Sequence, residues 1–152
     1  MNLALKVVPP VQLIISIILM FGLAYYFPQY QFSLPLNIPL IIILIALAGI
    51  IGSLALIDFR KHKTTYHPHT PEKTSTVVNS GIYAYSRNPM YLALVLILLA
   101  LALYLKNIAC FTTIPLFIWY ITQYQIKPEE IMLNKLFPND YKTYSQKVRR
   151  WL

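Results

Sequence analysis

The chain has 152 residues, of which 57% are hydrophobic and only 12% are charged, and its mean hydropathy is +0.55. A soluble domain carries about twice that share of charged residues, and this length excludes a soluble enzyme with separate nucleotide and substrate domains. Thirteen Lys and Arg against five Asp and Glu give a net charge of +8. In so apolar a chain, that balance indicates loops facing anionic lipid, not a nucleic-acid-binding surface. The composition predicts one integral membrane domain, residues 1–152, with no nucleic-acid partner.

Three long stretches without a charged residue predict the membrane-spanning segments. The first has 51 positions, between Lys6 and Asp58, and two others have 18 and 20 positions, on either side of Lys106. A bilayer core takes roughly 20 apolar residues per helix, and Pro28 and Pro35 interrupt the first stretch. The sequence therefore predicts an all-α bundle of four transmembrane helices. They are expected over about residues 10–27, 37–57, 89–105 and 107–125, the last two as an antiparallel hairpin.

The positions of Lys and Arg predict how this bundle lies in the membrane. With both termini in the cytoplasm, twelve Lys and Arg lie on the cytoplasmic side and only Lys106 lies on the other. Short cytoplasmic loops are enriched in these residues, so this orientation is expected. The cytoplasmic parts are then a loop over residues 58–88 and a C-terminal segment over 126–152. The compact length favours a bacterial or archaeal source and hence the cytoplasmic membrane.

The C-terminal segment is predicted to form two helices that meet at Pro138. Lys127-Pro128-Glu129-Glu130 is typical of a helix start, because proline and acidic residues suit the first turn. Asn139 or Asp140 is expected to cap the second helix. Large apolar residues then recur at spacings of three and four, so this helix lies on the membrane surface or packs against the bundle. These residues are Phe137, Tyr141, Tyr144, Val148 and Trp151.

No metal or nucleophile site is predicted from the remaining reactive side chains. His62, His67 and His69 lie in one loop, but no carboxylate or thiol pattern completes a ligand set around them. Cys110 is expected in the middle of a helix, where a thiol behaves as a small hydrophobic group.

Polar residues are expected to meet where the third predicted span begins and the fourth ends. Two interpretations fit: an aromatic belt with helix-end charges, or a pocket for a cationic or zwitterionic ligand, with aromatic faces, an arginine and carboxylates. The residues at this level are Tyr83, Tyr85, Arg87, Asn88, Tyr91, Glu129 and Glu130.

Two blocks at this level resemble a known group of membrane enzymes. Residues 80–91, Ser-Gly-Ile-Tyr-Ala-Tyr-Ser-Arg-Asn-Pro-Met-Tyr, are similar to the G-x-Y-x-x-x-R-[HN]-P-x-Y block of isoprenylcysteine carboxyl methyltransferases and phospholipid methyltransferases. Residues 129–144 are similar to their E-E-x-x-L-x-x-x-F-x-x-x-Y-x-x-Y block. The resemblance covers about residues 60–152, and the predicted helical hairpin joins the two blocks.

The resemblance implies a methyltransferase that uses S-adenosyl-L-methionine and a lipophilic acceptor, a lipid or small molecule that enters from the bilayer. In these families the cofactor lies in a cytoplasmic pocket formed by helix ends and the C-terminal segment. Carried over by position, Arg87 and Glu130 are the catalytic residues, with Arg87 pairing with the methionyl carboxylate or holding the loop. The alternative for Arg87 is that its side chain reaches lipid phosphate at the membrane surface. The cofactor contacts implied are Ser75, Thr76, Val77, Val78, Tyr83, Asn88, Pro89, Met90, Tyr91 and Glu129.

The acceptor and its base stay open at this point. Carboxyl-methylating relatives have arginine at the position of Gln125, and glutamine cannot supply the charge that a carboxylate acceptor favours. A prenylcysteine carboxyl O-methyltransferase is therefore the alternative, and a non-enzymatic four-helix exporter or scaffold is a third hypothesis. His62, His67 and Glu130 are equal as possible bases.

Overall fold

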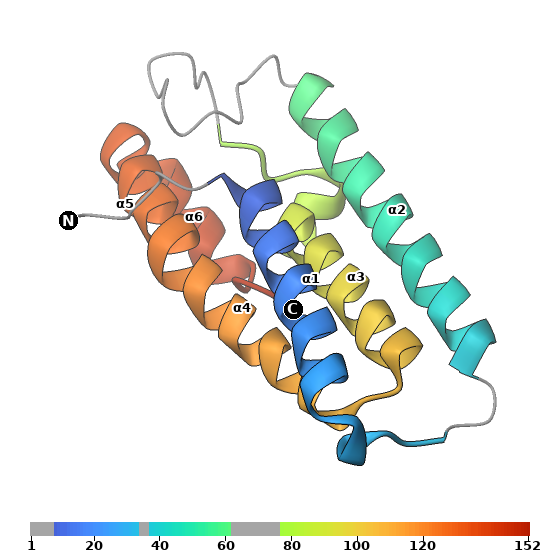
Figure 1. Ribbon diagram of the computed structural model, residues 1–152. Coiled ribbons are helices and arrows are strands. Elements are labelled where there is room, and N and C mark those ends of the chain that lie inside the picture. Colours follow the sequence, from blue (N-terminus) through green and yellow to red (C-terminus); the bar gives the residue numbers. More distant parts are fainter. Residues whose placement is uncertain (1–7, 34–36, 62–76) are drawn as a thin grey trace.

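The computed structural model describes residues 8–33, 37–61 and 77–152, and within these ranges the chain is helical, without a β-strand. The all-α prediction is confirmed for these residues. Figure 1 shows long helices lying side by side, with α5 and α6 at one end. The helices are α1 (Pro9–Tyr26), α2 (Asn37–Lys61), α3 (Pro89–Leu105), α4 (Thr113–Ile121), α5 (Lys127–Leu136) and α6 (Pro138–Lys147).

The fourth predicted helix differs most from its expected form. It begins as a 3-10 turn (Ile108–Thr112), so Cys110 lies in that turn and not in the middle of a helix as predicted. After the short α4, a π turn (Thr122–Ile126) leads without a break into α5, and Lys127 N–H donates to Thr122 O. Pro128 has no N–H for a regular helical bond, which is a physical reason for irregular pairing at this point.

The α1–α2 connection and the α3–α4 turn lie together at one end of the bundle. Lys106 ends α3 in the left-handed region, with φ 50°. Asn107 then accepts a hydrogen bond from Ala109 N at 2.9 Å and donates one to Phe27 O at 2.8 Å. Phe32 N donates to Lys106 O at 2.9 Å. These bonds satisfy polar backbone groups near the helix ends and tie the segment that follows α1 to the α3–α4 turn.

α3 is the helix around which the others pack (Figure 1). On one side, Leu98 and Ala102 of α3 join Met20 of α1 and Phe117 of α4 in the main apolar cluster. On the other side, α3 packs against α2 through a smaller cluster that includes Leu44. The small alanines of α3 let its neighbours approach closely, as is usual between membrane helices.

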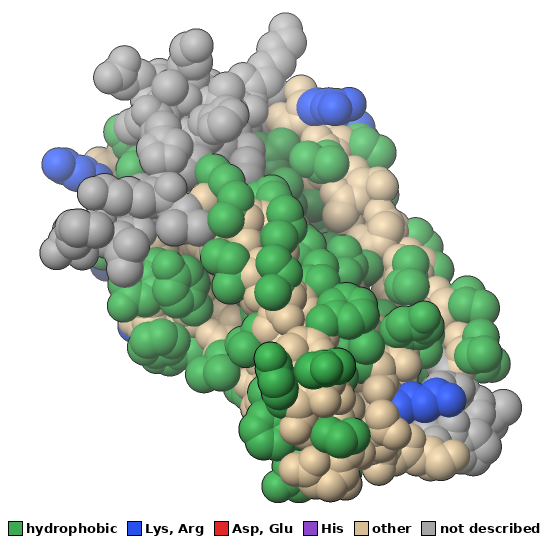
Figure 2. Space-filling model, in the orientation of Figure 1, with side chains coloured by type: hydrophobic (Ala, Val, Ile, Leu, Met, Phe, Trp, Pro, Cys, Tyr) green, Lys and Arg blue, Asp and Glu red, His purple; other side chains and the backbone are tan. Residues whose placement is uncertain are grey.

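Much of the apolar surface of the bundle faces outward. α1 and the Ile38–Lys61 part of α2 are each long and apolar enough to cross a membrane, and α3 is a shorter apolar helix. Ile18 and Ile42 are 66% and 61% exposed. Figure 2 shows hydrophobic side chains along the length of the visible face. Water disfavours so large a continuous apolar surface, so the fold indicates association with a membrane.

The helix break predicted at Pro138 is confirmed, but the predicted cap is wrong. α5 ends at Leu136, and α6 begins at Pro138 itself. Phe137 takes the N-cap position with no side-chain hydrogen bond, so neither Asn139 nor Asp140 caps the helix. Proline at the first position explains this register, because its fixed φ suits a helix start and its missing N–H costs little there.

The apolar face predicted for α6 packs against the rest of the protein. Tyr141 and Tyr144 are buried against Val77, with Phe137 and Val148 beside them. Trp151, expected on the same face, packs instead against the main cluster of the bundle. Of the two predicted positions for this helix, the structure therefore shows packing against the bundle end.

Candidate active site

The end of α2 fixes the start of the 77–91 segment. Asp58 Oδ2 accepts a hydrogen bond from Ile82 N at 3.0 Å. Gly81 has φ +59°, and a side chain there would also collide with the Asp58 carboxylate. Glycine is needed here because its backbone tolerates this conformation and leaves room for the carboxylate. Gly81 therefore allows the chain to turn here and sets the direction of the residues that follow it.

Tyr83 links this segment to both α2 and α6. Its ring is buried and packs edge-on against Phe59 of α2, with 5.2 Å between the ring centroids. Its carbonyl oxygen accepts a hydrogen bond from the Tyr144 hydroxyl at 2.7 Å. Burial raises the pKa of the Tyr144 hydroxyl, which keeps it protonated as a donor. Val78 and Met90 pack into the same cluster as Tyr83.

The two sequence motifs meet directly at Glu129. The Tyr91 hydroxyl donates to Glu129 Oε1 at 2.8 Å, and Gln125 Nε2 donates to the same oxygen at 2.6 Å. Tyr91 belongs to α3, Gln125 to the π turn and Glu129 to α5. Because both donors reach Oε1, neither occupies Oε2. We call these three side chains the Glu129 cluster.

The surroundings of Glu129 favour its uncharged form. Burial, and to a smaller extent the nearby Glu130 charge, raise the pKa of its carboxyl to about 7, even though the hydrogen bonds from Gln125 and Tyr91 lower it. Gln125 is 1% exposed, and its Oε1 has no hydrogen-bond partner among the residues that the structure describes. A buried acceptor without a donor costs free energy, so the cluster favours a ligand that brings hydrogen-bond donors or positive charge.

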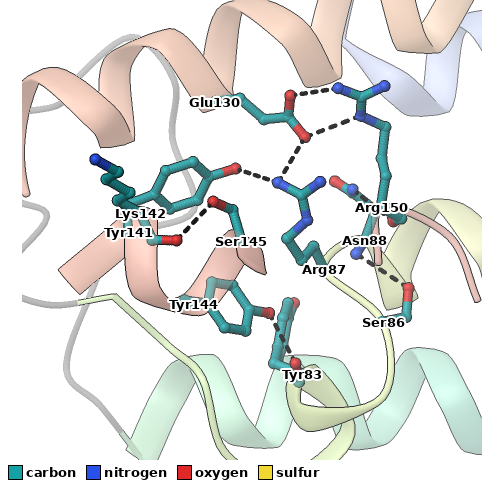
Figure 3. A network of polar contacts seen from close by, with 10 residues as sticks. All are labelled: Tyr83, Ser86, Arg87, Asn88, Glu130, Tyr141, Lys142, Tyr144, Ser145 and Arg150. Atoms are coloured by element: carbon teal, nitrogen blue, oxygen red, sulfur yellow. Dashed lines mark hydrogen bonds and ion pairs between the residues drawn. The ribbon is translucent and has the colours of Figure 1, made fainter. Parts of the chain in front are cut away.

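Glu130, the next residue, lies among cations instead (Figure 3). Its Oε1 is 3.1 Å from Arg87 Nη1, and Arg150 donates to both of its oxygens, at 2.9 and 2.7 Å. Arg87 Nη1 also donates to the Tyr141 hydroxyl at 3.0 Å. The fork-shaped contact with Arg150 is the geometry in which arginine binds a carboxylate most strongly. We call these four residues the Glu130 network.

Backbone contacts bring the end of the chain to the first motif. Arg87 N donates to Arg149 O at 3.1 Å, and Asn88 Nδ2 donates to Arg150 O at 2.9 Å. Asn88 N–H donates to Ser86 Oγ at 3.2 Å (Figure 3). The side-chain amide of Asn88 therefore helps to hold the C-terminal segment in place.

The predicted site residues fall into three groups. Tyr91 with Glu129, and Arg87 with Glu130, are brought into direct contact. Others are structural neighbours of these pairs: Val77, Val78, Tyr83, Asn88, Pro89 and Met90, most of them with side chains already in apolar packing or in bonds within the chain. The third group lies outside the described residues: Ser75, Thr76 and the loop histidines His62, His67 and His69.

Three contacts of these pairs were missed from the sequence. Gln125 was noted only as a departure from a motif, although its spacing of four from Glu129 is the helical spacing for direct contact. Tyr141 was expected only as part of an apolar face, and its hydroxyl binds Arg87. Arg149 and Arg150 are adjacent and alike in the sequence, and only the ion pair with Glu130 distinguishes Arg150.

Comparison with known proteins identifies the family. Residues 36–140 match the phospholipid methyltransferase family. The chain belongs to that family. An uncharacterized protein of Haemophilus influenzae is 49% identical over 63 residues, which are 41% of this chain and the whole of that protein. No solved structure matches the chain.

Family membership confirms the resemblance seen in the two motifs and gives the chain a general chemistry. The family is one of methyltransferases, which implies methyl transfer to a lipid-like substrate. The match begins before α2 and ends at the start of α6, so it contains both Glu129 and the first motif. The apolar helices agree with a membrane location for such an enzyme.

Proposed function

We propose that this protein transfers the methyl group of S-adenosyl-L-methionine to a lipophilic acceptor at the cytoplasmic face of the membrane. The observation that carries the proposal is the Glu129 cluster, where the first and second motifs meet at the end of an apolar bundle. The cofactor would supply an electrophilic methyl group on a sulfonium. Its methyl group would pass to a lone pair of the acceptor, with the neutral thioether as the leaving group and a base taking the acceptor proton.

The residues of the cluster fit this cofactor chemically. The cofactor is a cation with an ammonium group and ribose hydroxyls, so it presents both charge and hydrogen-bond donors. Glu129 Oε2 and the unpaired Gln125 Oε1 are acceptors for such groups. Tyr91 adds an aromatic ring to the cluster, which favours a cation. A bound cation would also favour ionised Glu129, since an opposite charge lowers a carboxyl pKa.

Arg87 and Glu130 act in this proposal by holding the site together. Glu130 already binds two guanidinium groups, and Arg87 already binds Tyr141. These contacts support a positioning role for both residues. For Arg87 they favour holding the loop over pairing with the methionyl carboxylate. Methyl displacement needs alignment, exclusion of water and a deprotonated acceptor more than it needs protein groups in the reaction.

Gln125 bears on the choice of acceptor. A buried arginine would help to bind a carboxylate, whereas Gln125 is neutral and touches Glu129. A carboxylate acceptor placed here would face Glu129 without a compensating cation in the cluster. We therefore propose a lipid or lipid-like acceptor that carries no carboxylate at the methylated atom, in preference to a prenylcysteine carboxylate.

The proposal includes four membrane spans, formed by α1, α2, α3 and the run from the 3-10 turn through α4 to the π turn. The α1–α2 connection and the α3–α4 turn, with Lys106, lie at the end opposite to the Glu129 cluster. Arg60, Lys61, Arg87 and Lys127 lie toward the cluster end. The positive-inside rule then supports a cytoplasmic site and cytoplasmic termini.

The test is calorimetric titration of S-adenosyl-L-methionine into the detergent-purified protein and into Glu129→Gln. Loss of one charge-assisted hydrogen bond should weaken binding by about tenfold or more. Asp140→Gln is the matched control, because it removes an exposed carboxylate outside the cluster and should leave the affinity unchanged.

Each outcome decides a part of the proposal. Equal binding by the wild type and Glu129→Gln would remove Glu129 from the cofactor site. A folded wild type that binds no S-adenosyl-L-methionine would overturn the proposal and favour a non-enzymatic bundle. If the wild type does bind S-adenosyl-L-methionine, transfer of a radiolabelled methyl group to extracted lipid would identify the acceptor class. This transfer should be lost in Glu129→Gln.

A further inference from the structure

A second site lies between α5 and α6, on a face of α5 that does not contain Glu129. A pocket of about 430 Å³ opens there. Its α5 wall consists of Lys127, Glu130, Ile131 and Asn134, which follow the spacing of one helix face. Tyr141 and Ser145 form its α6 wall, and Arg87 and Arg150 also line it.

The pocket has more positive than negative charge. Among the described residues that line it, Glu130 is the one acidic residue, and both arginines already bind it. Three cations against one carboxylate leave a net charge of +2 on the lining. Lys127 is exposed, and its described side-chain contact is the neutral Gln123. Arg87 Nε is buried without a hydrogen-bond partner among the described residues, so the site has unused capacity to stabilise an anion.

The position of the pocket indicates where such an anion would come from. Lys127 directly follows the π turn, at the point where the apolar helices give way to polar ones. In a membrane-bound protein this is the level of the lipid headgroups, where basic side chains attract anionic phosphates. The donors that the pocket offers to phosphate oxygens are the Lys127 ammonium, the amide of Asn134 and those N–H groups of the two arginines that do not bind Glu130.

We propose that the pocket between α5 and α6 binds a phosphate group, with an anionic lipid headgroup or free phosphate as its source. This site is separate from the Glu129 cluster. Gln125 and Glu129 share the face of the helix that meets Tyr91, whereas Lys127, Glu130 and Asn134 share the face toward α6. Bound phosphate would hold α5 and α6 against the membrane surface, independently of the acceptor that is methylated.

The experiment measures lipid binding to the full-length protein in detergent by native mass spectrometry. The probes are dioleoylphosphatidylglycerol and dioleoylglycerol, which share their acyl chains and differ in the phosphate headgroup. Lys127→Gln should weaken phosphatidylglycerol binding by about fivefold, the usual effect of one basic residue at a membrane surface. Lys135→Gln is the matched control, because it removes an equal charge from the same helix outside the pocket.

Equal loss in both lysine variants would overturn the proposal, because it would show diffuse attraction by a basic surface. Retention of dioleoylglycerol as well as phosphatidylglycerol would also overturn it. Excess inorganic phosphate distinguishes the sources: displacement of the lipid shows that free phosphate suffices, and no displacement assigns the site to a lipid headgroup.

The same preparations separate this inference from the proposed function. Lys127→Gln should bind S-adenosyl-L-methionine as the wild type does, and Glu129→Gln should bind phosphatidylglycerol as the wild type does. A parallel loss of lipid binding in Glu129→Gln would contradict two separate sites. Failure of S-adenosyl-L-methionine binding, with lipid binding still sensitive to Lys127, would overturn the methyltransferase proposal alone.

Discussion

Glu129 and Glu130 are neighbours in the sequence, but they lie in opposite electrostatic surroundings. Glu129 faces the bundle and accepts hydrogen bonds from the neutral Tyr91 and Gln125. Glu130 faces α6 and pairs with Arg87 and Arg150. Successive side chains of a helix point about 100° apart. This rotation separates Glu129, whose pKa is about 7, from Glu130, which lies within a network of ion pairs.

The two carboxyls therefore have different roles. The Glu130 network joins the first motif, α5 and the C-terminal segment, so its charges contribute mainly to the assembly of the site. The Glu129 carboxyl has no cation beside it in the cluster and carries a pKa of about 7. It is therefore the group of the pair whose charge a cationic ligand would change.

The largest expected effect is on the stability of Glu130→Gln. This change leaves two partly buried guanidinium groups without their carboxylate, and loss of one partner from such a network costs about 3 kcal/mol. Thermal unfolding in detergent should show the loss. Glu129→Gln is the control and should unfold close to the wild type, because it replaces a carboxyl that favours its neutral form. Equal destabilisation of the two variants would contradict the difference drawn between them.

The second expected effect is a pH dependence of cofactor binding. Glu129 is protonated below its pKa of about 7 and ionised above it. If the ionised form binds the cation, affinity for S-adenosyl-L-methionine should rise about tenfold between about pH 6 and pH 8. Calorimetry across this range checks the sign. The affinity of Glu129→Gln should not change over this range. A wild-type affinity that falls with rising pH would show that a group other than Glu129 controls cofactor binding.

A smaller effect is expected at the hydroxyl that completes the Glu130 network. Tyr141→Phe removes the acceptor of an Arg87 hydrogen bond and keeps the buried ring. The loss should be about 1 kcal/mol of unfolding free energy. Tyr85→Phe makes the same chemical change on a side chain that is 75% exposed, so it should have no measurable effect. The two variants can be compared in one denaturation series.

The smallest expected effect concerns the pKa of Glu129, which the hydrogen bond from Gln125 lowers. Gln125→Met keeps the side-chain length but removes the donor that favours the ionised carboxyl. The midpoint of the pH profile for cofactor binding should move upward by roughly half a pH unit. Gln123→Met, in the same π turn, is the control. A downward shift, or equal shifts in the two variants, would show that Gln125 does not act on Glu129.

Several elements followed directly from the order of residues. The charge-free stretches predicted the positions of α1 and α3, and Pro138 predicted the break between α5 and α6, because proline disrupts a helix interior. The spacing of apolar residues predicted the buried face of α6 that contains Tyr141 and Tyr144. The two motifs predicted that Tyr91 and Glu129 belong to one site, and the structure shows them in contact.

The tertiary structure alone decided how these parts act together. The π turn could not be predicted, because Pro128 removes a regular helical hydrogen bond but does not specify which irregular pairing replaces it. The same is true of Arg150, whose partner is twenty positions away. Local sequence sets helix boundaries and apolar faces, which depend on near neighbours. The charge of a carboxyl depends on burial and on partners that only the folded chain brings within a few ångströms. For that reason the sequence determined the family and the pair of carboxyls, and the fold assigned each of them its environment.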